Sequence, residues 1–367
     1  MTTSGLATDS SPSSTNAQAT TESATAPPGP SSPTSDPPLL EVEDLVVEIP
    51  TRRGTLRPVD GVSFTIRRGE ILGVVGESGA GKSITGAALI GLLERPARIG
   101  GGRVTLDGTR LDTMDENALR RVRGARVGTV FQDPSTSLNP LRTVGDQLAE
   151  TALVHLDISR AEARERALRS LVDVGIPAAA DRLEAWPHEF SGGMRQRVVI
   201  ALALIGEPEL VIADEPTTAL DVSVQAQILA LLRRLCTERG VGVMLVTHDM
   251  GVIAETTDRV AVMYAGRVAE VGPTREVLTE ALHPYTRGLM GATPDASPER
   301  DARDRLAQIP GAMPGLTAVP PGCAFHPRCP KAMAVCESER PEGVRRGEAR
   351  VWCWLHPPDG MSREGGA

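Results

Sequence analysis

The pattern of apolar and polar positions changes sharply near residue 39. Residues 1–38 are mostly Ser, Thr, Pro and Ala, with almost no large apolar side chains. Such a segment cannot bury enough surface to offset its ordering entropy, so we interpret it as a disordered tail. From Leu39 onward, LLEVEDLVVEI and VDGVSFTI alternate apolar and polar residues, which predicts strands of a half-exposed antiparallel sheet.

Continuous apolar runs then alternate with helical patterns. The runs ILGVV (71–75), LVIAD (210–214) and VMLVTHD (243–249) are typical of strands buried on both faces. Residues 143–190 have a largely helical pattern, and the helix VQAQILALLRRLCTERG ends at Gly240. This alternation predicts an α/β fold with a mostly parallel core sheet, an antiparallel β subdomain and a helical subdomain.

The chain divides into three segments by composition. After the tail at 1–38, a principal domain covers 39–280, with its helical subdomain at about 143–190. The hairpin VAVMY-AG-RVAEV closes this domain. Residues 281–367 are rich in Pro, Gly and charge and contain four of the five Cys. We interpret them as a separate carboxyl-terminal appendage.

Charge and hydropathy exclude several classes of protein. The 39 basic and 47 acidic side chains give a formal net charge of −8, so nucleic acid is not the default partner. No run of eighteen apolar residues occurs, which argues against a membrane-spanning helix. The first residues lack the basic and apolar regions of a secretory signal, so we expect a cytoplasmic protein. In that compartment, Cys residues more often bind metal or stay reduced than form disulfides.

A glycine-rich turn follows strand 71–75 and opens a predicted helix. It fits G-x-x-x-x-G-K-[ST], in which the backbone N–H groups and the positive helix end face phosphate oxygens. Lys82 is expected to reach the β- and γ-phosphates of ATP, and the Ser83 hydroxyl to ligate Mg²⁺. The loop consists of Gly76, Glu77, Ser78, Gly79, Ala80, Gly81, Lys82 and Ser83.

Two acidic residues follow at the end of strand 210–214. Ligands of parallel sheets bind at the carboxyl ends of the strands, so both carboxylates should lie beside the phosphate loop. Asp214 is the predicted Mg²⁺ partner, and Glu215 the general base that acts on the attacking water. An ordinary strand exit also ends in polar residues, but the P-loop favours the catalytic interpretation.

These residues resemble the nucleotide-binding subunits of ATP-binding cassette (ABC) transporters. Further motifs occur in the order of that family. Gln132 in VFQDP resembles the Q-loop, His248 in VTHDM the H-loop, and Thr218-Ala219-Leu220-Asp221 the D-loop. Ser191-Gly192-Gly193-Met194-Arg195-Gln196 resembles the signature motif, with Met194 where the commonest version has Gln.

The resemblance implies a role for each motif. Gln132 would sense Mg²⁺ and connect the site to membrane partners, and His248 would contact the γ-phosphate. The helix end at Ser191, Gly192 and Gly193 would cap the γ-phosphate held by the opposite subunit. Asp221 would belong to the same shared interface. Two ATP molecules would then join the subunits of a head-to-tail dimer. The family's usual adenine-stacking aromatic is missing from residues 49–57, which leaves Arg53 or Arg57 as possible substitutes.

The appendage resembles the extension of oligopeptide/dipeptide-type importers, a class that also serves nickel uptake. The resemblance begins at His283-Pro284-Tyr285-Thr286, continues through the Cys-containing segment, and with the cassette covers nearly everything after residue 38. It implies an ATPase subunit that powers peptide import across the cytoplasmic membrane from its cytoplasmic face. It also implies a second ATPase subunit, identical or homologous, two transmembrane permease subunits and an extracytoplasmic solute-binding protein.

Four thiols of the appendage form a candidate metal site. The spacing C-x5-C-x6-C-x16-C differs from common zinc modules and favours a [4Fe–4S] cluster, which some members of the resembled class carry. Zn²⁺, with His326 or His356 as substitute ligands, and plain reduced thiols are the alternatives. Cys236, on the helix 224–239, is predicted to be a core residue. The candidate ligands are Cys323, Cys329, Cys336 and Cys353.

Three other functions remain as alternatives. An importer of nickel or another small solute would share every feature above. A soluble ABC ATPase acting on nucleic acid or ribosomes would share the catalytic motifs, but the acidic balance and the appendage argue against it. A degenerate regulatory cassette is opposed by the intact Lys82, Asp214, Glu215 and His248.

Overall fold

The computed structural model describes residues 37–218, 220–292 and 308–358 of the chain. The expected disordered tail lies outside these residues, apart from Pro37 and Pro38. The first strands form an antiparallel sheet in the order β2-β1-β4-β5, as their alternating pattern predicts. Its strands are β1 (Leu40–Thr51), β2 (Gly54–Ile66), β4 (Arg98–Leu106) and β5 (Thr109–Arg110).

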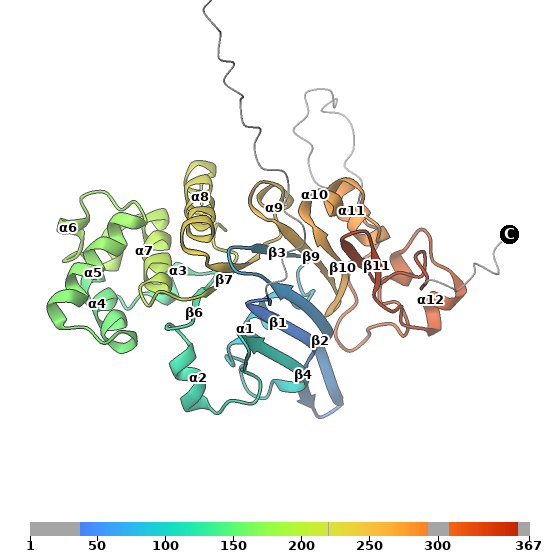
Figure 1. The fold of residues 1–367 in the computed structure, drawn as a ribbon. Helices are drawn as coiled ribbons and strands as arrows, with labels where there is room; N and C mark the ends of the chain where they lie inside the picture. Colours follow the sequence, from blue (N-terminus) through green and yellow to red (C-terminus); the bar gives the residue numbers. More distant parts are fainter. Residues whose placement is uncertain (1–36, 219, 293–307, 359–367) are drawn as a thin grey trace, which may run out of the picture. The chain divides into compact units, whose positions relative to one another are not determined.

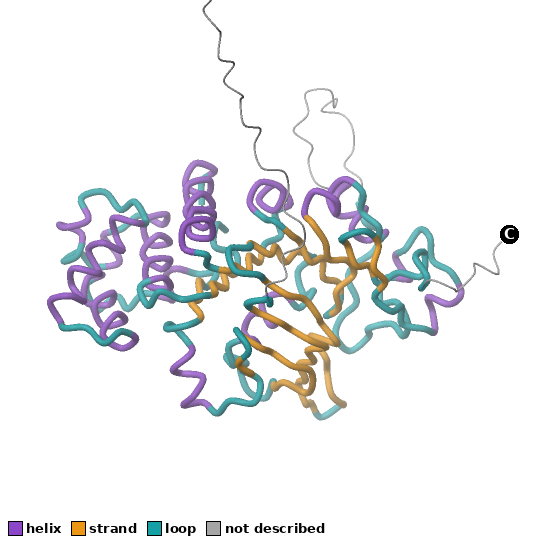
Figure 2. The backbone as a smooth tube through the Cα atoms, viewed as in Figure 1, coloured by secondary structure: helices purple, strands orange, loops and turns teal. Residues whose placement is uncertain are grey.

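The second sheet has the order β11-β12-β10-β9-β3-β8-β7-β6 (Figure 2). Five neighbouring strands run parallel: β9 (Arg259–Tyr264), β3 (Ile71–Val75), β8 (Gly242–Val246), β7 (Leu210–Asp214) and β6 (Val127–Val130). Every residue of β3 and β8 is buried, which explains their continuous apolar sequences. The antiparallel strands β10 (Arg267–Pro273), β12 (Ala349–Val351) and β11 (Val344–Arg346) complete the sheet.

Residues 143–190 form the expected group of helices, which lie together at one end of Figure 1. Helix α5 begins with a reciprocal capping box between Ser159 and Glu162, which satisfies backbone donors at the helix start. The group comprises α4 (Val144–His155), α5 (Arg160–Asp173), α6 (Ala179–Arg182) and the 3-10 turn η1 (Pro187–Glu189), and α7 (Gly192–Leu204) packs against α4 and α5.

The remaining helices cover the sheets and the carboxyl-terminal segment. In the cassette they are α1 (Lys82–Leu89), α2 (Glu116–Val122), α3 (Pro134–Ser137), α8 (Val222–Arg239), α9 (Met250–Thr256) and α10 (Thr274–Thr279). Beyond residue 280 they are α11 (Pro284–Ala292), the 3-10 turn η2 (His326–Arg328) and α12 (Ala334–Ser338). Cys236 is 1% exposed on α8, so its prediction as a core residue is confirmed. The described residues contain no helix long and apolar enough to cross a membrane.

The helix after the P-loop is shorter than its sequence indicates. The apolar pattern extends towards Pro96, but α1 ends at Leu89. Gly91 adopts a positive φ of 64°, and the Arg123 guanidinium donates hydrogen bonds to the carbonyl oxygens of Ile90 and Gly91. A side chain distant in sequence thus satisfies carbonyls that a longer helix would have bonded internally.

The carboxyl-terminal segment is not the separate appendage that its composition indicates. Its strand β12 pairs with β10 and extends the core sheet. Its residues Tyr285, Ala324 and Phe325 are buried in a cluster with Val75 and Tyr264 of the cassette. The segment lacks the periodicity of an independent core because its apolar residues complete a core that belongs mostly to the cassette.

Candidate active site

The P-loop joins β3 to α1 and requires its glycines. Gly76 and Gly81 have φ values of 152° and 98°. A Cβ on Gly76 would lie 2.2 Å from the Met263 carbonyl oxygen, and one on Gly81 would lie 2.5 Å from the Pro58 carbonyl oxygen. Larger residues would therefore collide with backbone atoms of β2 and β9 and displace the loop.

Lys82 lies inside the loop that precedes it. Its ammonium group donates to the carbonyl oxygens of Gly76, at 2.8 Å, and Glu77, at 3.2 Å. Burial lowers the pKa of Lys82, against the opposing effect of the Glu215 and Asp214 carboxylates. Oxygen atoms, here two carbonyls, are the kind of partner that a P-loop lysine also finds in phosphate groups.

Ser83 and Asp214 meet beside the loop, as the sequence predicts. The Ser83 hydroxyl donates to Asp214 Oδ1 at 3.1 Å, which joins the start of α1 to the end of β7. Burial raises the pKa of Asp214, and the neighbouring Glu215 carboxylate adds to that effect. A hydroxyl and a carboxylate are oxygen ligands that suit Mg²⁺, which usually takes its remaining ligands from phosphate and water. The residues present therefore fit this ion.

Glu215 is the centre of a hydrogen-bonded group. Its Oε2 accepts from Gln132 Nε2 at 3.1 Å and from the Thr218 hydroxyl at 2.9 Å, and its Oε1 lies 3.1 Å from His248 Nδ1. Burial alone would raise the pKa of Glu215, but the bonds with His248 and Thr218 outweigh it, so this pKa lies below its ordinary value. The ionised form of this carboxylate is therefore favoured.

The backbone at Glu215 has an uncommon conformation. Its φ is +47°, in the left-handed region that residues with a Cβ rarely adopt, while its N–H still donates to the Val246 carbonyl. The turn lies directly after β7 and sets the direction of the side chain. Backbone strain of this kind persists where surrounding bonds over-determine it, and it is concentrated at active sites.

The signature residues form a different surface. Ser191 caps α7 by accepting from the Met194 N–H, and Asp221 caps α8 by accepting from the Val224 N–H. Both line an open pocket of about 390 Å³ together with Gly192 and Gly193. Of the described residues that line this pocket, none belongs to the P-loop. The structure thus brings together Lys82, Ser83, Gln132, Asp214, Glu215 and His248, and places the signature residues in a second group.

Comparison with known proteins identifies the class. The ABC transporter family matches residues 59–218, and the family described as the oligopeptide/dipeptide transporter, C-terminal region, matches residues 269–336. A dimeric ATP-binding cassette solved with ADP and phosphate is 28% identical, with a TM-score of 0.59 over 64% of this chain and 99% of that one. These matches cover both the cassette and much of the extension that follows it.

Individual relatives span nearly the whole described chain. The dipeptide transport ATP-binding protein DppD of Bacillus subtilis is 46% identical over 86% of this chain and 94% of its own length. The oligopeptide transport ATP-binding protein OppD of Salmonella typhimurium is 48% identical over 85% and 92%. The chain therefore belongs to the ATP-binding subunits of ABC transporters, and it is an ATPase with the cassette fold.

The four candidate cysteine ligands converge without forming disulfides. Burial raises the pKa of Cys323 and Cys329, and raises that of Cys353 to about 12. Together with Cys336 they line one small pocket that also includes His283. However, no group of three or more His, Cys, Asp or Glu among the described residues is arranged to hold a metal ion.

Sequence reasoning missed three residues at the active site. Thr218 donates to the Glu215 carboxylate, and Tyr285 and Arg328 of the carboxyl-terminal extension bond to Glu77 in the P-loop. Thr218 lies in the D-loop motif, which offered a local signal. Tyr285 and Arg328 are more than 200 residues away from Glu77, at separations of 208 and 251, and no local pattern connects them.

Proposed function

We propose that this chain hydrolyses ATP to power the import of oligopeptides or dipeptides across the cytoplasmic membrane. The supporting observation is the convergence of Gln132, the adjacent pair Asp214 and Glu215, and His248, from three separate segments, beside the P-loop. The solute class rests on the relatives, which are named for dipeptide and oligopeptide transport, and on the matching extension. Import of nickel or another small solute is the second candidate, because the solute pocket would lie on other chains.

Each residue has a role that its position supports. Lys82 leaves the carbonyls of its own loop for the β- and γ-phosphates, where its charge is more strongly attracted. Ser83 and Asp214 would hold Mg²⁺, which supplies charge neutralisation on the phosphates when bound. Glu215 takes a proton from the attacking water, since its carboxylate is ionised and lies one residue beyond the Mg²⁺ partner.

The bonds around Glu215 have a consequence for activation. Gln132, Thr218 and His248 bond to its two oxygens, so the attacking water has to compete with them. A contact of Gln132 with Mg²⁺ and of His248 with the γ-phosphate would free oxygens of Glu215 for that water.

The second group of residues acts on a partner's nucleotide. Ser191, Gly192 and Gly193 present the open N-terminus of α7, which attracts anionic phosphate. This pocket is lined by no described P-loop residue, so a nucleotide that binds here would take its P-loop contacts from a second cassette. Asp221, which lines the same pocket, would belong to that interface. Two such subunits, identical or homologous, would close around two ATP molecules.

The proposed assembly rests on the class of the relatives. We assign residues 39–280 to the cassette, with its helical subdomain at about 143–190, and 281–367 to the extension. The subunit would associate with the cytoplasmic face of the membrane through two permease subunits. An extracytoplasmic binding protein would deliver the solute.

Reconstitution tests this function. The full chain should be assembled with its permease subunits and binding protein in vesicles, and ATPase activity measured with di- and oligopeptides, with Ni²⁺ and without solute. Peptides should stimulate hydrolysis in the normal chain but not in Lys82→Ala. Stimulation by Ni²⁺ alone would transfer the assignment to the second candidate. Recovery of the chain with ribosomes or nucleic acid instead of membranes would reject transport altogether.

For the cysteine pocket we propose a [4Fe–4S] cluster held by Cys323, Cys329, Cys336 and Cys353. The support is the chemistry of the donors: four free thiols line one pocket. Thiolate is the usual ligand of such clusters. The spacing C-x5-C-x6-C-x16-C differs from that of common zinc modules, so Zn²⁺ is the less favoured alternative.

Metal analysis decides between these occupants. Protein purified without oxygen should contain about four iron and four sulfide per chain and absorb broadly near roughly 400 nm. Replacing Cys336 by Ser should remove this absorption but leave ATP binding at the P-loop. About one zinc per chain would support the alternative, and neither metal would return the pocket to reduced thiols.

A further inference from the structure

Glu77, the second residue of the P-loop, is bonded on three sides. Its carbonyl accepts from Lys82, its N–H donates to Tyr285 Oη at 2.9 Å, and its carboxylate pairs with Arg328 Nη1 at 2.9 Å. The carbonyl also accepts from the Ala80 N–H at 3.1 Å, so the bonds to the carbonyl come from the cassette and the other two come from the carboxyl-terminal extension. Both the amide N–H and the carboxylate of Glu77 are thus bonded to the extension.

Arg328 connects three parts of the chain. Its side chain is 8% exposed. Besides Glu77 it donates to Tyr264 Oη at 3.3 Å and to the carbonyl oxygens of Pro310 and Gly311, at 2.8 and 3.2 Å. A nearly buried guanidinium with four acceptors has a strongly preferred position, and its direction determines where the Glu77 carboxylate can lie.

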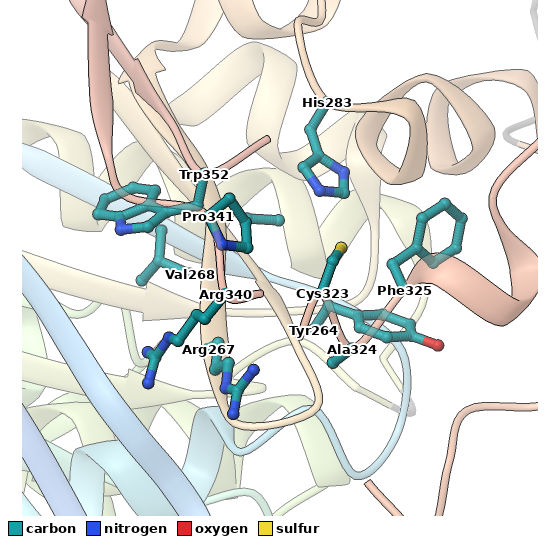
Figure 3. Close-up of a pocket in the computed structure, with 11 residues that line it drawn as sticks. Tyr264, Arg267, Val268, His283, Cys323, Ala324, Phe325, Arg340, Pro341 and Trp352 are labelled. Carbon is teal, nitrogen blue, oxygen red and sulfur yellow. The ribbon is translucent and has the colours of Figure 1, made fainter. Parts of the chain in front are cut away.

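Tyr285 belongs to an aromatic cluster at the same contact. Its ring centroid lies 4.6 Å from that of Tyr264 and 5.3 Å from that of Phe325. The chain has only two Tyr, and both lie here. Figure 3 shows Tyr264 and Phe325 close to Cys323, across the pocket from Trp352. This pocket has a volume of about 40 Å³, so it is a packing seam with room for little more than water.

We propose that Arg328 and Tyr285 are positioning residues of the ATP site, through which the carboxyl-terminal extension holds the first turn of the P-loop. The extension also approaches the loop at Met313, whose Cε would lie 3.6 Å from a Cβ added to Gly79. The extension is therefore a structural part of the nucleotide site in this chain, in addition to any role of its cysteines.

The bonds from Tyr285 and Arg328 to Glu77 matter most for the shape of the P-loop when nucleotide is bound. Lys82 Nζ donates to the Glu77 carbonyl, which also accepts from the Ala80 N–H at 3.1 Å. If the ammonium turns to the β- and γ-phosphates, the bonds from Ala80, Tyr285 and Arg328 still hold Glu77. Tyr285 and Arg328 thus help to keep the loop in its binding conformation, which lowers the reorganisation that ATP binding requires.

Binding measurements on the full chain test this proposal. Arg328→Met keeps a long side chain but leaves the Glu77 carboxylate without its charged partner. We expect the Kd for Mg·ATP, measured by isothermal titration calorimetry, to rise about tenfold or more. Tyr285→Phe removes one hydrogen bond and should raise Kd about threefold. Arg345→Met is the matched control, because Arg345 is an exposed arginine of the same extension bonded to the Gly347 carbonyl. It should bind like the normal chain.

A double variant separates positioning from simple unfolding of the extension. Glu77→Gln combined with Arg328→Met removes both charges, so no ionised group is left unpaired, and Kd should return to within about threefold of normal. In the assembled transporter, Arg328→Met should raise KM for ATP while kcat changes by less than about twofold, because Arg328 touches no reacting atom.

Two results would overturn the proposal. One is an unchanged Kd in Arg328→Met under conditions where Lys82→Ala loses binding. The other is a double variant as weak as Arg328→Met alone, which would mean that Arg328 acts through the extension in general and not through Glu77. Neither outcome depends on which solute is transported, so the test is independent of the assignment to peptide import.

Discussion

The two nucleotide-facing regions of this chain differ in how completely they are bonded. Around the P-loop, Lys82 is bonded to loop carbonyls, Ser83 to Asp214, and Glu215 to Gln132 and His248. The signature region is an open pocket of about 390 Å³ at the start of α7, and a Cβ on Gly192 would meet no described atom within 4 Å.

The difference fits the proposal that each region supplies one half of a site. In that proposal the P-loop region binds ATP through its own chain, and the signature region offers helix N–H groups to the nucleotide of a second cassette. The following predictions can break or sharpen this contrast.

The largest effect is expected at the catalytic carboxylate. Glu215→Gln keeps the shape of the side chain but removes the base, so hydrolysis should fall about 10²-fold or more while ATP stays bound. The unconsumed ATP should also trap a dimer, which size-exclusion chromatography with light scattering would detect. Lys82→Ala is the comparison, because it should lose ATP binding first. Near-normal turnover in Glu215→Gln would reject this residue as the base.

A large effect on ATP-dependent dimerisation is expected at Ser191. Ser191→Arg places a bulky cation in the open pocket, so ATP-dependent dimerisation and hydrolysis should be abolished. The affinity of the isolated chain for ATP should stay within about twofold, since its own P-loop is untouched. Equilibrium binding and light scattering measure the two properties separately. A marked loss of monomer affinity would contradict the assignment of this pocket to the partner's nucleotide.

The adjacent residues Gly192 and Gly193 provide a matched pair of alanine variants. Their expected effect, on the free energy of unfolding, is smaller than the loss of hydrolysis expected at Ser191. A Cβ on Gly193 would lie 2.8 Å from Val224 Cγ1, so Gly193→Ala should lower the free energy of unfolding by about 1–3 kcal/mol. Gly192→Ala should change it by less than about 0.5 kcal/mol. Denaturant titration distinguishes them. If Gly192→Ala impairs hydrolysis by the dimer while the fold is intact, this glycine faces a ligand from outside the chain.

The smallest expected effect concerns the cap of α7. Ser191 accepts from the Met194 N–H at 3.3 Å, so Ser191→Ala should cost about 1 kcal/mol in the free energy of unfolding. Ser191→Asp preserves a capping oxygen and should cost less. Thermal unfolding of the two variants checks the order. Equal stability of both would mean that Ser191 is present for its ligand and not for the helix.

Local patterns were enough to predict most of the cassette. The buried strands β3, β7 and β8, the P-loop and the group of helices at 143–190 all lie where their sequences indicate. Each depends on a rule that acts over a few residues: apolar continuity in a strand covered on both faces, helical spacing, or glycines at close backbone contacts. The order of catalytic motifs added the family and, through it, the expected site.

Other features depended on contacts that no short pattern encodes. The end of α1 is set by Arg123, and the extension joins the core sheet through β12. Glu215 is bonded to Gln132 and His248, and Glu77 is bonded to Tyr285 and Arg328. The partners in these bonds are 33 to 251 positions apart in the sequence. The sequence by itself therefore determined which groups carry the chemistry, because residue type and local backbone set their reactivity. Only the tertiary structure decided which groups restrain one another, because hydrogen bonds and ion pairs depend on distances that arise when remote segments pack together.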